Sequence, residues 1–175
     1  MARHEDLPDF HIPHADKIDW MIETSGWALE PVAPFYDSDP PRPGYAYSIG
    51  IPHRFAFTEI VVFGLTPVAV KGLVDLVLEQ VGAGVDIPRG VPLTGLFDND
   101  LRCVFADVDL AVHGHLFETA RRWHRGLDFA MVQLLWPDRS GWLPYESGFD
   151  RAVSPAQPVI GQVEAVDGAG GSDGP

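Results

Sequence analysis

The chain has 175 residues, of which 46% are hydrophobic and 21% are charged, and its 25 acidic residues against 12 lysines and arginines give a net charge of −13. A chain of this length is expected to form one domain with a sizeable core, without disulfide or metal staples. The acidity disfavours nucleic-acid or anionic-membrane binding, because phosphate groups demand clustered basic residues. It suits a docking surface for a basic protein partner, and no cofactor is expected.

The cellular address is predicted by elimination. No apolar run approaches the roughly 20 residues of a membrane span, and the first ten residues do not resemble a secretory signal. We therefore expect a cytoplasmic protein. The single cysteine, Cys103, excludes an internal disulfide and lies in the apolar run 101–108, which predicts a buried structural thiol.

The first elements are an irregular N-terminal arm, a helix and a strand. The arm is expected over residues 1–15. The helix is expected over residues 16–25, with Gly26 just beyond its end. Residues 26–32 predict an edge strand, because Pro31 has no N–H to donate to a neighbouring strand.

The next segment is a proline-rich loop followed by two strands. Residues 34–43 contain four prolines, which predicts a loop. Strands are expected at residues 45–49 and 59–63, joined by a turn over residues 50–57. The second strand is a continuous β-branched run, typical of a central strand covered on both faces.

The clearest helix pattern runs from Thr66 to Gly82. Thr66 is a favourable N-cap, and Pro67 fits the first turn. Apolar residues recur every three or four positions and form one core-facing stripe. On the opposite side Lys71 and Asp75 are spaced to pair.

The last predicted elements alternate between strands and a helix. Segments 95–97 and 101–108 flank Asp98-Asn99-Asp100, which predicts a hairpin. A helix is expected over residues 116–125, and a second continuous apolar strand over residues 129–136.

These patterns predict a single α+β domain over residues 16–160. Hairpin-like strand pairs mixed with single helices favour a mainly antiparallel sheet of about five strands with two to three packed helices. Residues 161–175 become rich in glycine and aspartate. They are expected to form a disordered tail, because they cannot bury enough apolar surface to fold.

One segment invites a catalytic interpretation. Residues 46–50 resemble the nucleophile elbow of serine hydrolases, in which a strand, a strained turn and a helix present the serine. Residues 51–55 do not predict a helix, so a strand serine before a turn is the favoured interpretation of Ser48. His53 is near enough in sequence to serve as a base, with Arg54 beside it, but a solvated turn explains both residues.

Two histidines suggest a metal site. His113 and His115 would share one face if the chain were extended, as metal ligands require. Glu118 follows three residues later, but His124 falls on the far side of the expected helix, so a full ligand set is missing. Structural or exposed histidines are the favoured interpretation.

A Trp-Pro-Asp segment at residues 136–138 is similar to the acid loop of tyrosine phosphatases. Those enzymes need a cysteine with an arginine six residues later, and six residues after Cys103 stands Asp109, so this activity is excluded. The favoured interpretation is a turn capped by an aspartate. The predicted binding residues are Arg54, Trp136, Asp138, Trp142 and Tyr145.

Five segments carry a family resemblance. They are Tyr45-Ala-Tyr-Ser-Ile-Gly50, Glu59-Ile-Val-Val-Phe-Gly-Leu65, Gln133-Leu-Leu-Trp-Pro-Asp138, Gly141-Trp-Leu-Pro-Tyr-Glu146 and Gln157-Pro158. In this order they resemble a bacterial family, the domain-of-unknown-function family numbered 4262, over about residues 20–160. The chain departs from the family at Thr58, where the family has a proline. The resemblance implies no activity, so it carries no site residue over.

A second resemblance concerns function. An aromatic-Ser-Ile-Gly strand, a turn and a glutamate-led strand are similar to suppressor-of-fused-type domains, which include bacterial immunity proteins of toxin systems. With the acidity, this resemblance implies a non-enzymatic interaction module with a basic partner. The alternative is a small-molecule-binding protein or hydrolase with a site formed by Ser48, His53 and the Trp136–Trp142 turn. The oligomeric state is left open.

Overall fold

The computed structural model describes residues 13–97 and 100–165. Most of the expected N-terminal arm, the centre of the predicted hairpin turn (98–99) and most of the tail (166–175) lie outside the described residues. The elements in chain order are α1 (His14–Ser25), β1 (Ala28–Val32), β2 (Tyr45–Ile49), α2 (Ile51–Arg54), β3 (Glu59–Phe63), α3 (Pro67–Gly82), β4 (Val104–Val108), α4 (Leu110–His113), η1 (Gly114–Leu116), α5 (Glu118–Trp123), β5 (Met131–Leu135), η2 (Ser154–Ala156) and β6 (Gly161–Gln162).

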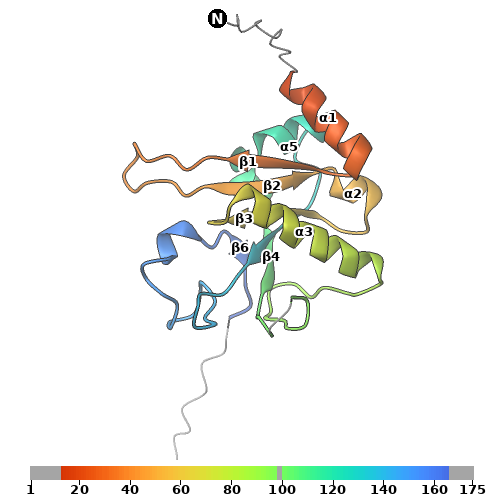
Figure 1. Ribbon diagram of the computed structural model, residues 1–175. Coiled ribbons are helices and arrows are strands. Elements are labelled where there is room, and N and C mark those ends of the chain that lie inside the picture. The colour runs from red at the N-terminus through yellow and green to blue at the C-terminus, as the bar shows by residue number, and fades with distance from the viewer. Residues whose placement is uncertain (1–12, 98–99, 166–175) are drawn as a thin grey trace, which may run out of the picture.

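A six-stranded sheet forms the centre of the domain, in the order β1-β2-β3-β5-β4-β6. Figure 1 shows β1, β2 and β3 side by side, with β4 and β6 on the side of β3 away from β1. Neighbouring strands are antiparallel except for β3 and β5, which are parallel. The predicted α+β class and mainly antiparallel sheet are confirmed, with one strand more than expected. The additional strand, β6, has only two residues, too few to give a sequence pattern. Its Gly161 is required because a Cβ there would collide with Ala106 of β4.

The predicted strands at residues 45–49 and 59–63 are confirmed as β2 and β3, and β3 is buried along its whole length. β1 lies at the edge of the sheet, as Pro31 predicted. The strand expected at residues 95–97 is wrong. Gly95 has a φ of 87°, which breaks the extended run, and the chain makes only an isolated bridge from Leu93 to Cys103 before β4.

Helices cover both faces of the sheet, as the two continuous apolar strands predicted. On one face Ile60 and Val62 of β3 pack in a cluster with α3 and with the buried thiol of Cys103. On the other face Val61 and Phe63 pack in a cluster with α1 and α5. The two faces therefore share β3, and α3 and α5 lie on opposite sides of it (Figure 1).

Helix α3 follows its sequence pattern closely. Thr66 Oγ1 accepts a hydrogen bond from the backbone N–H of Ala69 at 3.3 Å, and Lys71 Nζ donates to Asp75 at 2.7 Å. Burial of each core-facing side chain contributes about 1.5–3 kcal/mol. These side chains are Val70, Val74, Val77 and Leu78.

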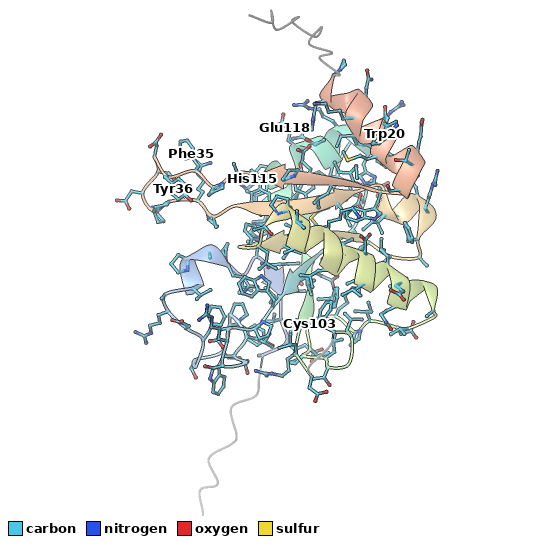
Figure 2. The ribbon with its side chains drawn as sticks, viewed as in Figure 1. Trp20, Phe35, Tyr36, Cys103, His115 and Glu118 are labelled. Atoms are coloured by element: carbon cyan, nitrogen blue, oxygen red, sulfur yellow. The ribbon has the colours of Figure 1, made fainter. Side chains whose placement is uncertain are left out.

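Residues 33–44 connect β1 to β2 as a projecting hairpin, which we call the proline hairpin (Figure 1). The expected loop at residues 34–43 contains an isolated bridge. The backbone N–H of Phe35 donates to the carbonyl of Arg42, and that of Arg42 donates to the carbonyl of Phe35, at 3.0 and 2.8 Å. Phe35 and Tyr36 lie on its outer part (Figure 2).

Candidate functional site

The serine of the elbow-like segment lies where two strands separate. Pairing of β2 with β3 runs from Tyr45–Phe63 to Tyr47–Val61 and stops there. Beyond that point Ser48 Oγ accepts a hydrogen bond from the backbone N–H of Ile60 at 2.8 Å, so the hydroxyl replaces a backbone carbonyl of the ladder. The same hydroxyl donates to Glu59 Oε1 at 2.9 Å.

Glu59 closes this end of the sheet. Its carboxylate accepts backbone N–H groups from Gly50 at 2.8 Å and Ile51 at 3.1 Å, at the start of α2. The expectation that residues 51–55 form no helix is therefore wrong, since α2 makes one helical turn there. Its first N–H groups are satisfied by Glu59, a residue from the following strand, and not by a local cap.

His124 completes the buried cluster. Its Nε2 lies 2.7 Å from Glu59 Oε2, and the side chains of His124 and Glu59 are 6% and 0% exposed. The imidazole stacks on Phe129, with ring centroids 4.2 Å apart. We call Ser48, Glu59 and His124 the buried triad. Sequence reasoning missed the last two, and the available signal was a glutamate heading an apolar strand, because a buried carboxylate must find donors.

The hydrogen bonds of the buried triad give Ser48 a structural role. Among the described residues, the Ser48 hydroxyl bonds to Glu59 and to the Ile60 amide, and His53 is not one of its partners. His53 lies exposed on α2, with its ring edge-on to Trp123 at a centroid distance of 4.7 Å. No serine–histidine relay is thus assembled from these two residues.

The predicted site residues divide between two ends of the sheet. Because β2 is antiparallel to β3 and β5 is parallel to it, Ser48 lies near the start of β3 and β5, whereas Trp136 follows the end of β5. A five-residue strand separates the two ends by about 16 Å. The mouth expected from Ser48, His53 and the Trp136–Trp142 turn is therefore not formed, and Arg54 stays with α2 at the first end.

The alternative of a metal site at His113 and His115 required an extended segment, which the structure does not have. His113 ends α4 and His115 lies in η1, so the chain is helical there. No group of three or more His, Cys, Asp or Glu side chains suited to a metal ion occurs within residues 13–97 and 100–165.

The Trp136–Trp142 turn is organised by Asp138, as its interpretation as a capped turn predicted. The Asp138 carboxylate accepts the backbone N–H groups of Ser140, Trp142 and Asp150 at 2.8–3.0 Å. Desolvation works to raise the pKa of this carboxyl, but the backbone N–H groups together outweigh it, so the pKa lies below its ordinary value. The carboxylate of Asp138 therefore fixes the backbone of the turn.

A second acidic residue braces the same turn. Arg102 donates to both carboxylate oxygens of Glu146, at 2.6 and 3.2 Å, and to the carbonyl of Gly141 at 2.6 Å. The hydrogen bonds from Arg102 lower the pKa of the Glu146 carboxyl. Tyr145 is half-buried beside this pair, and burial raises the pKa of its hydroxyl.

The braced turn exposes one aromatic side chain, Trp142, and residues of the turn line two hollows. Trp142 is 44% exposed, and a Cβ on Gly148 would collide with its indole, so the ring lies against that glycine. One hollow, of about 620 Å³, is lined in part by Asp100, Leu101 and Trp142. The other, of about 440 Å³, is lined by Trp136, Pro137, Asp138, Arg139, Asp150 and Val153. We call this region the Trp142 surface.

Trp136 has a structural role beneath this surface. Its indole N–H donates to the carbonyl of Phe63 at 2.9 Å, and its backbone N–H donates to Gln157 at 3.0 Å. It therefore ties β5 to β3 and to the residue that follows η2.

The fold and site define an α+β domain with a mixed sheet, one end closed by a buried carboxylate and the other carrying a braced, exposed turn. The chain belongs to the family described as domain of unknown function (DUF4262), whose model matches residues 21–150. This confirms the family resemblance. No curated protein and no solved structure matches the chain. In the described part of the chain, every helix is too short or too polar to cross a membrane.

Proposed function

We propose that this protein is a non-enzymatic binding module that docks a basic protein partner on the Trp142 surface. The observation that supports it most is an exposed tryptophan on a turn whose backbone is fixed by two separate carboxylates, Asp138 and Glu146. Tryptophan is among the residues that contribute most to protein interfaces. A turn that is already ordered loses little conformational freedom on binding.

Charge supports a basic partner. The carboxylates of Asp100, Asp138 and Asp150 line the two hollows beside Trp142. Two cations line them as well, but the charge of Arg102 is matched by Glu146, which leaves Arg139. Together with the net charge of −13, this arrangement should attract a cationic protein and speed its association.

The buried triad, at the other end of the sheet, supports the proposal that the protein is not an enzyme. The hydroxyl of Ser48 and the carboxylate of Glu59 are buried and engaged with one another and with backbone N–H groups. These contacts account for both side chains as parts of the fold. The immunity-like role implied by the weaker resemblance is one form of this proposal, with a basic toxin as the partner.

The test is affinity capture with a matched pair of variants. Immobilised wild-type, Trp142→Ala and Trp20→Ala chains are exposed to lysate of the source cells, at about 0.05 M and 0.5 M salt. Trp20 is the control because it is also exposed, at 65%, but lies on α1 (Figure 2). The proposal expects a basic protein that wild-type and Trp20→Ala retain at low salt and Trp142→Ala does not.

The retained protein is then purified and titrated against the same three chains. We expect Trp142→Ala to weaken its binding at least tenfold, about 1.4 kcal/mol, because truncation of a central aromatic residue commonly costs more than that. Equal binding by wild-type and Trp142→Ala, or binding that salt does not weaken, would overturn the proposal.

A further inference from the structure

We infer that the proline hairpin and the groove beside it pair two copies of this chain across a two-fold axis. This goes beyond the basic partner proposed above, because it uses other residues and another kind of contact. Three features of the hairpin carry the inference: a preformed apolar groove, two exposed aromatic rings of which Tyr36 also lines that groove, and opposite charges on Arg42 and Asp37.

The groove is a hollow of about 720 Å³. It lies between the proline hairpin, the start of α3 and η2. Six of its lining residues are prolines, which lose no side-chain rotamer freedom when a contact forms. They are Pro31, Pro34, Pro41, Pro43, Pro67 and Pro155.

The protruding part of the contact lies on the same hairpin. Phe35 and Tyr36 are 48% and 76% exposed on it (Figure 2). A two-fold interface brings the same patch of both copies together, so the patch must fit itself. An apolar hollow with Tyr36 in its wall and Phe35 next to it meets this requirement, since the exposed rings of each copy can pack against the groove of the other.

The charges on the hairpin and in the groove also complement each other between two copies. Arg42 is the one charged residue that lines the groove, and its guanidinium lies 5.5 Å from the centre of the Phe35 ring. In the described part of the chain, no salt bridge involves Arg42. Asp37, next to Tyr36, is exposed. Insertion of one hairpin into the other groove would bring Asp37 of each copy to Arg42 of the other.

The edge strand does not offer an equivalent route. β1 is the outer strand on this side of the sheet, and Pro31 in its middle lacks an N–H. A second β1 strand would therefore find an interrupted ladder. Pairing of two copies through side chains of the hairpin is therefore favoured over pairing through the edge of β1.

Ionic strength separates this contact from the proposed partner. Two copies with a charge of −13 each repel one another, and salt screens that repulsion. Pairing of two copies should therefore strengthen as salt is added. Docking of a basic partner should weaken under the same change.

The first experiment is sedimentation equilibrium of the wild-type chain from about 1 to 500 µM at low and high salt. We expect a monomer–dimer equilibrium, tighter at high salt. Tyr36→Ala should weaken it about tenfold or more, and Trp20→Ala, which removes an equally exposed ring elsewhere, should not. A wild-type chain that is monomeric throughout, or a dimer that Tyr36→Ala leaves unchanged, would overturn the inference.

The second experiment exchanges the charges. Arg42→Glu alone and Asp37→Arg alone each place like charges at both contacts of a two-fold dimer, and each should be monomeric. An equimolar mixture restores opposite charges at both contacts and should dimerise. A mixture that stays monomeric while the wild-type chain dimerises would overturn this arrangement. If the chain is monomeric and the groove binds an apolar dye such as anilinonaphthalene sulfonate, the occupant is a small molecule and not a second copy.

Failure of this inference leaves the proposed function intact, and the reverse also holds. A monomer that still captures a basic protein through Trp142 would overturn only the pairing. A hairpin dimer whose Trp142→Ala variant behaves as wild type in capture would overturn only the docking proposal.

Discussion

Glu59 at one end of the sheet and Asp138 at the other both hold a turn in place by accepting backbone N–H groups. Glu59 accepts those of Gly50 and Ile51 and adds the side chains of Ser48 and His124. Asp138 accepts three backbone N–H groups and no side-chain donor among the described residues. The hydrogen-bond pattern is similar, but Glu59 is fully buried, whereas Asp138 lies on the surface.

The difference lies in what replaces the carboxylate when it is lost. Water can reach the N–H groups around Asp138 and satisfy them in part. Water cannot readily reach the donors around Glu59, and a buried donor without an acceptor carries the full cost of its desolvation. The buried end is therefore suited to fix the fold, and the exposed end can present side chains to another molecule.

The largest effect is expected for Glu59→Ala. It leaves several buried donors without an acceptor and removes the partner of His124, so the free energy of unfolding should fall by about 3–5 kcal/mol. Glu59→Gln keeps the size of the side chain and should cost less, because one oxygen still accepts. Urea denaturation followed by tryptophan fluorescence measures both variants. A loss below about 1 kcal/mol for Glu59→Ala would show that the triad does not hold this end together.

The second effect is expected for Ser48→Ala. The hydroxyl both accepts from Ile60 and donates to Glu59, so its removal should lower the free energy of unfolding by about 1–3 kcal/mol. Thr24→Ala is a useful control, since the Thr24 hydroxyl donates to backbone carbonyls at the exposed surface of α1. Equal stability of Ser48→Ala and wild type would contradict the structural role of Ser48.

The third effect is a difference in acid stability at the exposed end. The folded-state pKa of Asp138 lies below its ordinary 3.8, so its ionised form stabilises the fold above that pH, and this contribution is lost as pH falls through the folded-state pKa. Asp138→Asn should be less stable than wild type at about pH 6, with the gap closing towards about pH 3. Melting temperatures across this range measure the gap. A constant gap would mean that the ionised carboxylate is not what holds the turn.

The smallest effect on stability is expected for Trp142→Ala. The side chain is nearly half exposed and lies against Gly148, so the free energy of unfolding should change by less than about 1 kcal/mol. Urea denaturation measures the change. A larger loss would show that Trp142 supports the fold, as the residues around Glu59 do, and is not free to contact a partner.

Local patterns were sufficient for the elements whose contacts are local. α3 has its cap, its first-turn proline and its apolar stripe within residues 66–82, and all of these are found in the structure. β3 was predicted because a continuous β-branched run needs cover on both faces. The braced turn was predicted in part, since Pro137 and Asp138 mark a turn, but the contribution of Arg102 comes from a distant segment.

The candidate site depends instead on contacts between residues that are distant in sequence. His124 was placed on the far side of a helix by its spacing, yet it reaches Glu59, which is 65 residues away in sequence. The one turn of α2 was missed because the group that caps it comes from the next strand. A glutamate at the head of an apolar strand signals that it needs donors, but the residues near it in sequence do not say which groups supply them.

The sequence by itself therefore determined the α+β class, the central strands, the long helix, the net charge of −13 and the family. The tertiary structure alone decided that Ser48 is part of a buried triad, that the predicted site residues lie at opposite ends of the sheet, and that the proline hairpin stands beside a groove. The physical reason is the range of the interactions. Caps and apolar stripes act within a few residues, whereas the donors of a buried carboxylate are brought together only when the strands pair.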